Sequence, residues 1–226
     1  MSFSNPIPAA EIGQIFEEEI LALGGRLHDR FANEIYLFAR STLPAETEVQ
    51  KGDRVQGGVA LMSTAEEIRV HPYVFRQVCS NGAIRAHAVE TRRIAITDDL
   101  QGFVTADALR EAVRACAAPR VIYQGVSEMR SALEQQADMA LTLMPMLSHF
   151  PERQRTDLLM TIFRRFGADG DRSRFGLMNA ITSTARDTAD PETRWRLEEL
   201  GGGVPIASLQ TRPAPGTLKQ REVVTV

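Results

Sequence analysis

Hydrophobic and polar residues near the N-terminus repeat with the period of an α-helix. Apolar residues recur every three or four positions between Pro8 and Leu23, and glutamates lie between them. Gly24 and Gly25 follow, and glycine readily adopts the left-handed conformation that closes a helix. The pattern predicts an opening helix over residues 8–23 whose glutamates face solvent.

The period then changes to two, which is typical of strands with one buried face. Leu27 to Leu43 follows this alternation, and Val55 to Ser63 resumes the strand character with Gly57 and Gly58 inside it. Ile68 to His71 is predicted as a further short strand that ends at Pro72, because proline cannot donate a backbone hydrogen bond. Residues 73–78, which bring together Tyr73, Val74, Phe75 and Val78, fit either a short helix or a buried strand.

Asn81 and Gly82 form the strongest local turn signal in the chain. Both residues accept positive φ, so the pair favours a type I′ turn that reverses a strand tightly. Residues 83–96 are predicted to return as one long strand. Its alternation places Arg85, His87 and Arg93 on a single face.

The remainder of the chain has a helical period. One helix is predicted to start at Thr105 and to be broken by Pro119. A methionine-rich helix over residues 123–147 is typical of adaptable core or interface. Three more helices are predicted at residues 151–166, 173–188 and 191–200. The apolar side chains assigned to the inner face of the first of these three are Leu158, Leu159, Ile162 and Phe163.

These elements together predict an α+β protein. A curved, mostly antiparallel sheet over residues 26–97 is packed by a helical half over residues 105–203, within one domain of residues 1–210. Residues 211–226 contain prolines and lack a core pattern, so they are predicted to be a flexible tail.

The composition narrows the class of protein. No stretch approaches the roughly 18 uncharged apolar residues of a membrane-spanning helix, and the N-terminus lacks a secretion signal, so we expect a cytoplasmic protein. Cys79 and Cys116 show no partner pattern for a disulfide or a zinc site. No cofactor or metal is expected.

Charge bears on possible partners. The net charge of −3 argues against coating of nucleic acid by bulk positive charge. Lys51 and Lys219 are the only lysines, so nearly all basic residues are arginines. This bias follows either from a GC-rich genome or from the fit of guanidinium groups to phosphate and carboxylate.

Several short motifs resemble the phage/plasmid-like proteins of the DUF932 type. They are Gly52-Asp53, Gly58, Val78-Cys79-Ser80-Asn81-Gly82 and Asn179-Ala180-Ile181-Thr182. Ser80 stands where that family usually has threonine, and Thr64-Ala65 interrupts the family's Ser-Glu step between Ser63 and Glu66. The resemblance covers roughly residues 30–200. It implies a setting on phages, plasmids or integrative elements and offers no established activity.

The motif residues have two interpretations each. Cys79 is either a nucleophile activated by a neighbouring base or a buried structural thiol. Ser80, Asn81 and Gly82 either cradle a phosphate with backbone N–H groups or form a plain turn. Asn179 and Thr182 lie mid-helix, where a bridge to a neighbouring segment is the simpler interpretation. His28, His71 and His87 do not share a metal-ligand spacing.

The arginines suggest a binding surface. Arg85, His87 and Arg93 share a predicted strand face, which Arg69 with His71 extends on the next strand. A basic sheet face tracks a nucleic-acid backbone, and Tyr73 or Phe75 would stack on bases. The alternative is a solvated face whose arginines pair with Glu66, Glu67 and Glu90.

These patterns lead to two functional hypotheses. The first is a non-enzymatic accessory protein of a mobile element that interacts with DNA, in particular single strands, during recombination or replication. The second is a protein-interaction module, either an antagonist of host defence or a homo-oligomeric assembly factor with a host or phage partner. No catalytic residue is assigned. A small-molecule enzyme would require Cys79, Asn81 and Asn179 to converge in one pocket.

Overall fold

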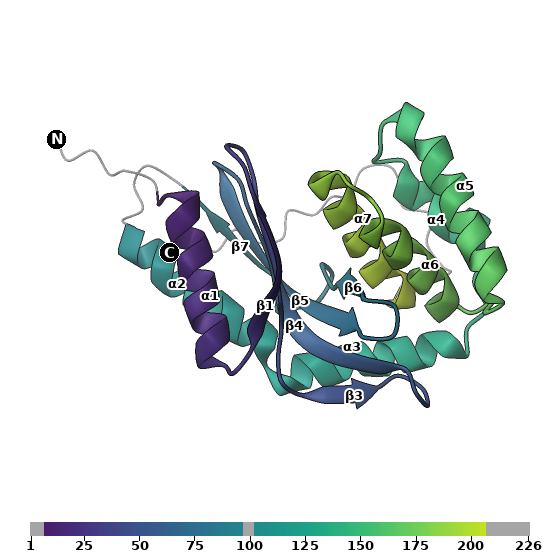
Figure 1. Cartoon of the computed structure of the whole chain (residues 1–226), viewed down its shortest axis with the longest axis horizontal. Coiled ribbons are helices and arrows are strands. Elements are labelled where there is room, and N and C mark those ends of the chain that lie inside the picture. Colours follow the sequence, from purple (N-terminus) through teal and green to yellow (C-terminus); the bar gives the residue numbers. More distant parts are fainter. Residues whose placement is uncertain (1–6, 97–101, 207–226) are drawn as a thin grey trace.

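The computed structural model of the protein describes residues 7–96 and 102–206, so the tail predicted at 211–226 lies outside the described residues (Figure 1). The strands are β1 (Arg26–Ala32), β2 (Leu37–Thr42), β3 (Glu46–Glu48), β4 (Arg54–Ser63), β5 (Glu67–Arg76), β6 (Asn81–Ile84) and β7 (Arg92–Ala95). The helices are α1 (Ala9–Ala22), α2 (Gly102–Ala117), α3 (Pro119–Leu133), α4 (Met139–Leu147), α5 (Glu152–Asp169), α6 (Arg174–Arg186) and α7 (Pro191–Gly203).

The strands form one curled antiparallel sheet, which confirms the predicted α+β class. The order is β1-β2-β4-β5, with β3 beside β4 and with β6 and β7 both beside β5. The edge strand β1 carries a register shift between Leu27 and Asp29, which is a β-bulge. Within the described residues, no helix is long and apolar enough to cross a membrane.

Helices cover both faces of the sheet (Figure 1). The helices α1 and α2 pack on one face around Phe16, Val59 and Val113. The helix α7 covers part of the other face, where Trp195 meets Phe38. In Figure 1, α3 runs along the bottom of the view from the side of α1 and α2 toward the group α4–α7.

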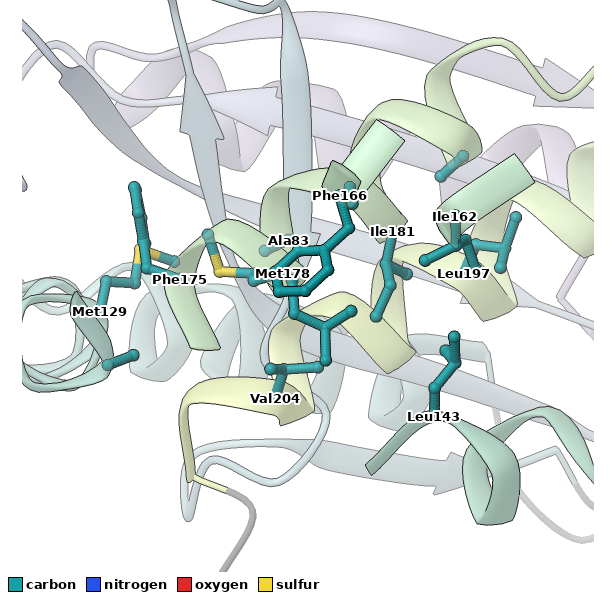
Figure 2. Close-up of a cluster of buried hydrophobic side chains, with 14 of the residues drawn as sticks. Ala83, Met129, Leu143, Ile162, Phe166, Phe175, Met178, Ile181, Leu197 and Val204 are labelled. Carbon is teal, nitrogen blue, oxygen red and sulfur yellow. The ribbon is translucent and has the colours of Figure 1, made fainter. Parts of the chain in front are cut away.

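The largest core cluster joins the C-terminal helices to the end of the sheet. Figure 2 shows part of this cluster, which includes Phe166 of α5, Ile181 of α6 and Leu197 of α7. Ala83 of β6 belongs to the same cluster. Burial of large apolar side chains contributes roughly 1.5–3 kcal/mol each, so this cluster holds the helical half against β6.

Pro72 does not end a strand, contrary to the sequence prediction. It lies inside β5, opposite Val59 of β4. Its carbonyl oxygen accepts from the Arg85 N–H at 2.9 Å, so its backbone polar groups point away from β4. On that side β7 pairs with residues 67–70 and β6 with residues 73–76, and the missing N–H falls in the gap between them. Residues 73–76 therefore belong to a strand, in which Tyr73, Val74 and Phe75 are buried.

The predicted Asn81-Gly82 turn and the long strand over 83–96 are also wrong. Asn81 and Gly82 already belong to β6 and pair with Arg76 and Phe75. Residues 77–80 make the turn, in which Ser80 has a positive φ of 49°. Gly82 is needed inside the strand because a Cβ there would overlap the ring of Tyr73.

The predicted helix over residues 123–147 is two helices, α3 and α4. The chain between them pairs with a distant segment, since the Arg174 N–H donates to the Gln135 carbonyl and the Ala137 N–H donates to the Arg172 carbonyl. Asp138 then caps α4 by accepting from the Leu141 N–H at 3.0 Å. These long-range contacts override the continuous apolar pattern.

Helix α7 approaches the sheet closely at its C-terminal end. The predicted helix stops at Leu200, whereas α7 continues through three glycines to Gly203. A Cβ at Gly202 would overlap the backbone carbonyl of Ile84 in β6. The glycine therefore permits a backbone-to-backbone contact that a larger residue would push apart.

We predict that Gly202→Ala lowers the free energy of unfolding by about 2 kcal/mol, because the clash is with backbone rather than with a flexible side chain. Urea denaturation measures the change. Gly167→Ala in α5 is the matched control, since no atom lies within 4 Å of its added Cβ and alanine favours a helix by roughly 0.5–1 kcal/mol. Equal stability of the two variants would contradict the close contact.

Candidate functional site

The two resemblance motifs meet in the folded chain. The Asn81 amide of β6 donates to the Thr182 hydroxyl of α6 at 2.6 Å, across 101 positions of sequence. Thr182 in turn donates to the Met178 carbonyl at 3.0 Å. Asn179 lines the same small cavity, of about 10 Å³. That volume accommodates roughly one water molecule, so it excludes a substrate.

A second polar group anchors the turn over residues 77–80. The Arg76 guanidinium donates to the Asp53 carboxylate at 2.6 Å and to the Cys79 sulfur at 3.2 Å. The Arg186 guanidinium of α6 donates to the Cys79 carbonyl at 2.5 Å. Burial lowers the pKa of the Arg76 guanidinium, whereas the hydrogen bond to Asp53 raises it. The net result is a raised pKa.

These contacts favour the structural interpretation of the motif. Asn81 and Asn179 line one cavity, but Cys79 is not among its lining residues, so the convergence required of a small-molecule enzyme is incomplete. Cys79 is half-buried and Cys116 fully buried. Burial raises the pKa of the Cys116 thiol to about 12, which keeps that thiol protonated.

Three of the six residues proposed to bind nucleic acid are buried. Tyr73 is 1% exposed and Phe75 is 8% exposed, so neither ring is available to stack on a base. Arg85 is 5% exposed and turns toward α3, where it donates to the Val121 carbonyl at 2.9 Å and to Glu128 at 2.8 Å. The alternation over residues 83–96 misplaced Arg85 because the strand stops at Ile84.

Two of the remaining residues do lie together. Arg69 of β5 and Arg93 of β7 are directly opposite in the antiparallel register, as the sequence analysis expected for this face. Arg69 also pairs with Glu67 of its own strand, as in the solvated alternative. His87 is exposed in the loop between β6 and β7, beside Gly203 of α7.

The helices α4 and α5 each carry exposed large apolar side chains. Leu141 and Met144 of α4 are 66% and 50% exposed, and Met160 and Phe163 of α5 are 49% and 58% exposed. The sequence analysis placed Phe163 inside, which is wrong. Ile162 and Phe166 fill the core instead. The sequence did contain a sign of this exposure, because the apolar residues of α5 cover more of the helix than one buried face can hold.

Comparison with family models, with curated proteins and with solved structures finds no match to this chain. The functional argument therefore rests on the chain's own surfaces.

We predict that Thr182→Val lowers the free energy of unfolding by about 2 kcal/mol, because it keeps the side-chain shape but leaves the buried Asn81 amide without its acceptor. Denaturation in urea provides the measurement. Ser183→Ala, on the same helix, is the control; its hydroxyl bonds only within its own turn, to the Ala180 carbonyl, and we expect a change within about 0.5 kcal/mol. An unchanged Thr182→Val protein would refute a structural role for the motif.

Proposed function

We propose that this chain is a non-enzymatic protein-interaction module that works as a symmetric dimer, joined through α5. The observation that supports this proposal is the exposure of Met160 and Phe163 beside each other on α5, with Leu141 and Met144 on the neighbouring α4. Exposed large apolar side chains that gather on one surface are typical of protein interfaces. The methionines add side chains that adapt to a partner surface.

The charges beside these residues favour a second copy of the chain as the partner. Asp157 and Arg164 are exposed and lie three positions before and four positions after Met160. Neither forms an ion pair within the residues that the structure describes. In an antiparallel pair of α5 helices that cross at Met160, Asp157 of each copy would face Arg164 of the other. The surface is thus complementary to itself, as a two-fold interface requires.

We predict that Asp157→Arg weakens dimerisation about tenfold, because two attractive pairs become repulsive and exposed pairs contribute up to about 1 kcal/mol each. The double variant Asp157→Arg with Arg164→Asp restores the attraction in reverse and should recover the dimer. Sedimentation equilibrium measures both association constants.

Phe163→Glu is expected to give a monomer, since it places a charge at the apolar centre of the contact. Tyr123→Glu is its control, because Tyr123 is 66% exposed on α3, away from α5. A wild-type chain that remains monomeric at high concentration would exclude the proposed dimer.

Binding of single-stranded DNA is a second candidate function, supported by the facing pair Arg69 and Arg93. Two opposed guanidinium groups suit successive phosphates of a backbone, and Arg69 would exchange its pairing with Glu67 for a phosphate. The resemblance to phage/plasmid-like proteins supports the corresponding setting, a cytoplasmic accessory role on a mobile element. This function has less support than the dimer, because Arg85, Tyr73 and Phe75 are buried and cannot contact DNA.

For this second function, we predict that Arg69→Ala with Arg93→Ala weakens the binding of a labelled oligonucleotide in low salt. The slope of log affinity against log salt should fall by about 1.4, from roughly 0.7 per single-strand phosphate contact. Fluorescence anisotropy measures both. Arg120→Ala with Arg153→Ala, at exposed positions of α3 and α5, is the control for removed charge. Absence of binding by the wild-type chain at low salt would eliminate the candidate.

A further inference from the structure

A cavity of about 450 Å³ opens where α7 meets the turns at the end of the sheet. Its volume falls in the range of roughly 300–1,000 Å³ that small-molecule sites occupy. It lies apart from both the motif cavity and the α5 surface. The lining residues are Ile35, Tyr36, Met62, Thr64, Ala65, Glu66, Glu67, Arg69, Glu192, Trp195, Arg196 and Glu199.

The charges in this cavity are unbalanced toward the negative. Both lining arginines are already paired with carboxylates, Arg69 with Glu67 and Arg196 with Glu192. The lining therefore holds four glutamates against two arginines, which leaves Glu66 and Glu199. Arg93, which faces Arg69, acts on Glu199 from nearby without forming an ion pair with it within the described chain.

Glu199 forms no ion pair with an arginine within the described residues. Its side chain is 24% exposed, and burial raises the pKa of its carboxyl, against the opposing effects of the Trp195 indole and of Arg69 and Arg93. The nearest basic group is the His71 Nε2, at 3.7 Å. Burial lowers the pKa of His71 to about 3, so the imidazole is neutral near pH 7 and supplies no positive charge.

An aromatic wall stands beside this carboxylate. Trp195 is 2% exposed and lines the cavity together with Tyr36. The indole N–H lies near Glu199 but makes no hydrogen bond of normal geometry, and the His71 Nε2 likewise has no hydrogen-bond partner. The Glu199 carboxylate is largely buried and is not paired with an arginine. Two buried atoms without hydrogen-bond partners, the Trp195 Nε1 and the His71 Nε2, lie beside it.

We propose that this cavity binds a small organic cation, with a protonated amine paired to Glu199 and an apolar body packed against Trp195 and Tyr36. An ammonium group supplies the ion-pair partner that Glu199 lacks and donates hydrogen bonds to its carboxylate. The half-buried ring of Tyr36 favours a cation through its electron-rich face and helps to bury the apolar body of the ligand, whereas the Trp195 ring already has the Arg40 guanidinium over it, 5.4 Å from its centroid. An anion would be repelled by Glu66 and Glu199, and the two lining arginines are already paired with glutamates.

Trp195 is the sole tryptophan of the chain, so its fluorescence reports directly on the cavity. The full chain is titrated with benzylamine, with uncharged benzyl alcohol and with anionic benzoate, three probes of similar size. We expect saturable quenching or a spectral shift with benzylamine at concentrations where the other two produce neither. Glu199→Gln should weaken benzylamine binding about tenfold or more, because it removes the charge and keeps the shape.

Glu152→Gln on α5 serves as the control for a lost charge elsewhere, and it should bind benzylamine as the wild type does. Benzylamine affinity should also fall as the pH is lowered through the pKa of the Glu199 carboxyl, since the protonated acid no longer attracts the amine. Equal responses to all three probes, preference for benzoate, or unchanged affinity in a folded Glu199→Gln protein would each overturn the proposal.

Discussion

The ion pair between Arg40 and Glu198 fixes the position of α7 on the sheet. Arg40 lies in the middle of β2 and Glu198 in α7, and their side chains are each 2% exposed. The guanidinium Nε and the carboxylate oxygen are 2.5 Å apart. Removing one partner of such a buried pair costs about 3–5 kcal/mol, because the other charge is left without compensation. The pair is therefore a strong constraint on where α7 lies.

Further charges complete this network at its edge. Asp29 of β1 accepts from Arg40 at 3.2 Å, and its carboxylate lies 2.9 Å from the Arg194 guanidinium of α7. Burial raises the pKa of the Glu198 carboxyl, and Arg40 and Arg194 act against that rise. Because Trp195 and Glu199 flank Glu198 on the same helix, the geometry of the cavity depends on this pair. The Asn81–Thr182 bond attaches the neighbouring helix α6 to the sheet in the same manner.

The sequence predicted the elements whose signals are local. The strand predicted over residues 55–63 matches β4, and the helical period identified α5 and α6 to within a few residues. It failed at Pro72 because the tolerance of proline there depends on where two other strands stop. It failed at Asn81 because a buried bond to a helix 101 positions away outweighs the turn preference of Asn-Gly.

Site prediction was weaker than fold prediction for a related reason. Whether an arginine is free to bind a ligand depends on its partners, and Arg85 finds its partner Glu128 across 43 positions of sequence. Arg69 and Arg93 were predicted to lie on one face of the sheet, and they are opposite each other in the register of β5 and β7. The cavity residues come from three separate parts of the chain, so no local motif marks them.

The bulged edge strand β1 has a consequence for the tendency of the chain to aggregate. An exposed sheet edge offers unpaired backbone groups to any passing strand, and regular edges therefore promote uncontrolled polymerisation. Here the register shift between Leu27 and Asp29 distorts that edge, and the charged Arg26 and Arg30 are exposed along it. A second chain would find no regular ladder to extend. The β1 edge is in this way a poor template for growth of the sheet.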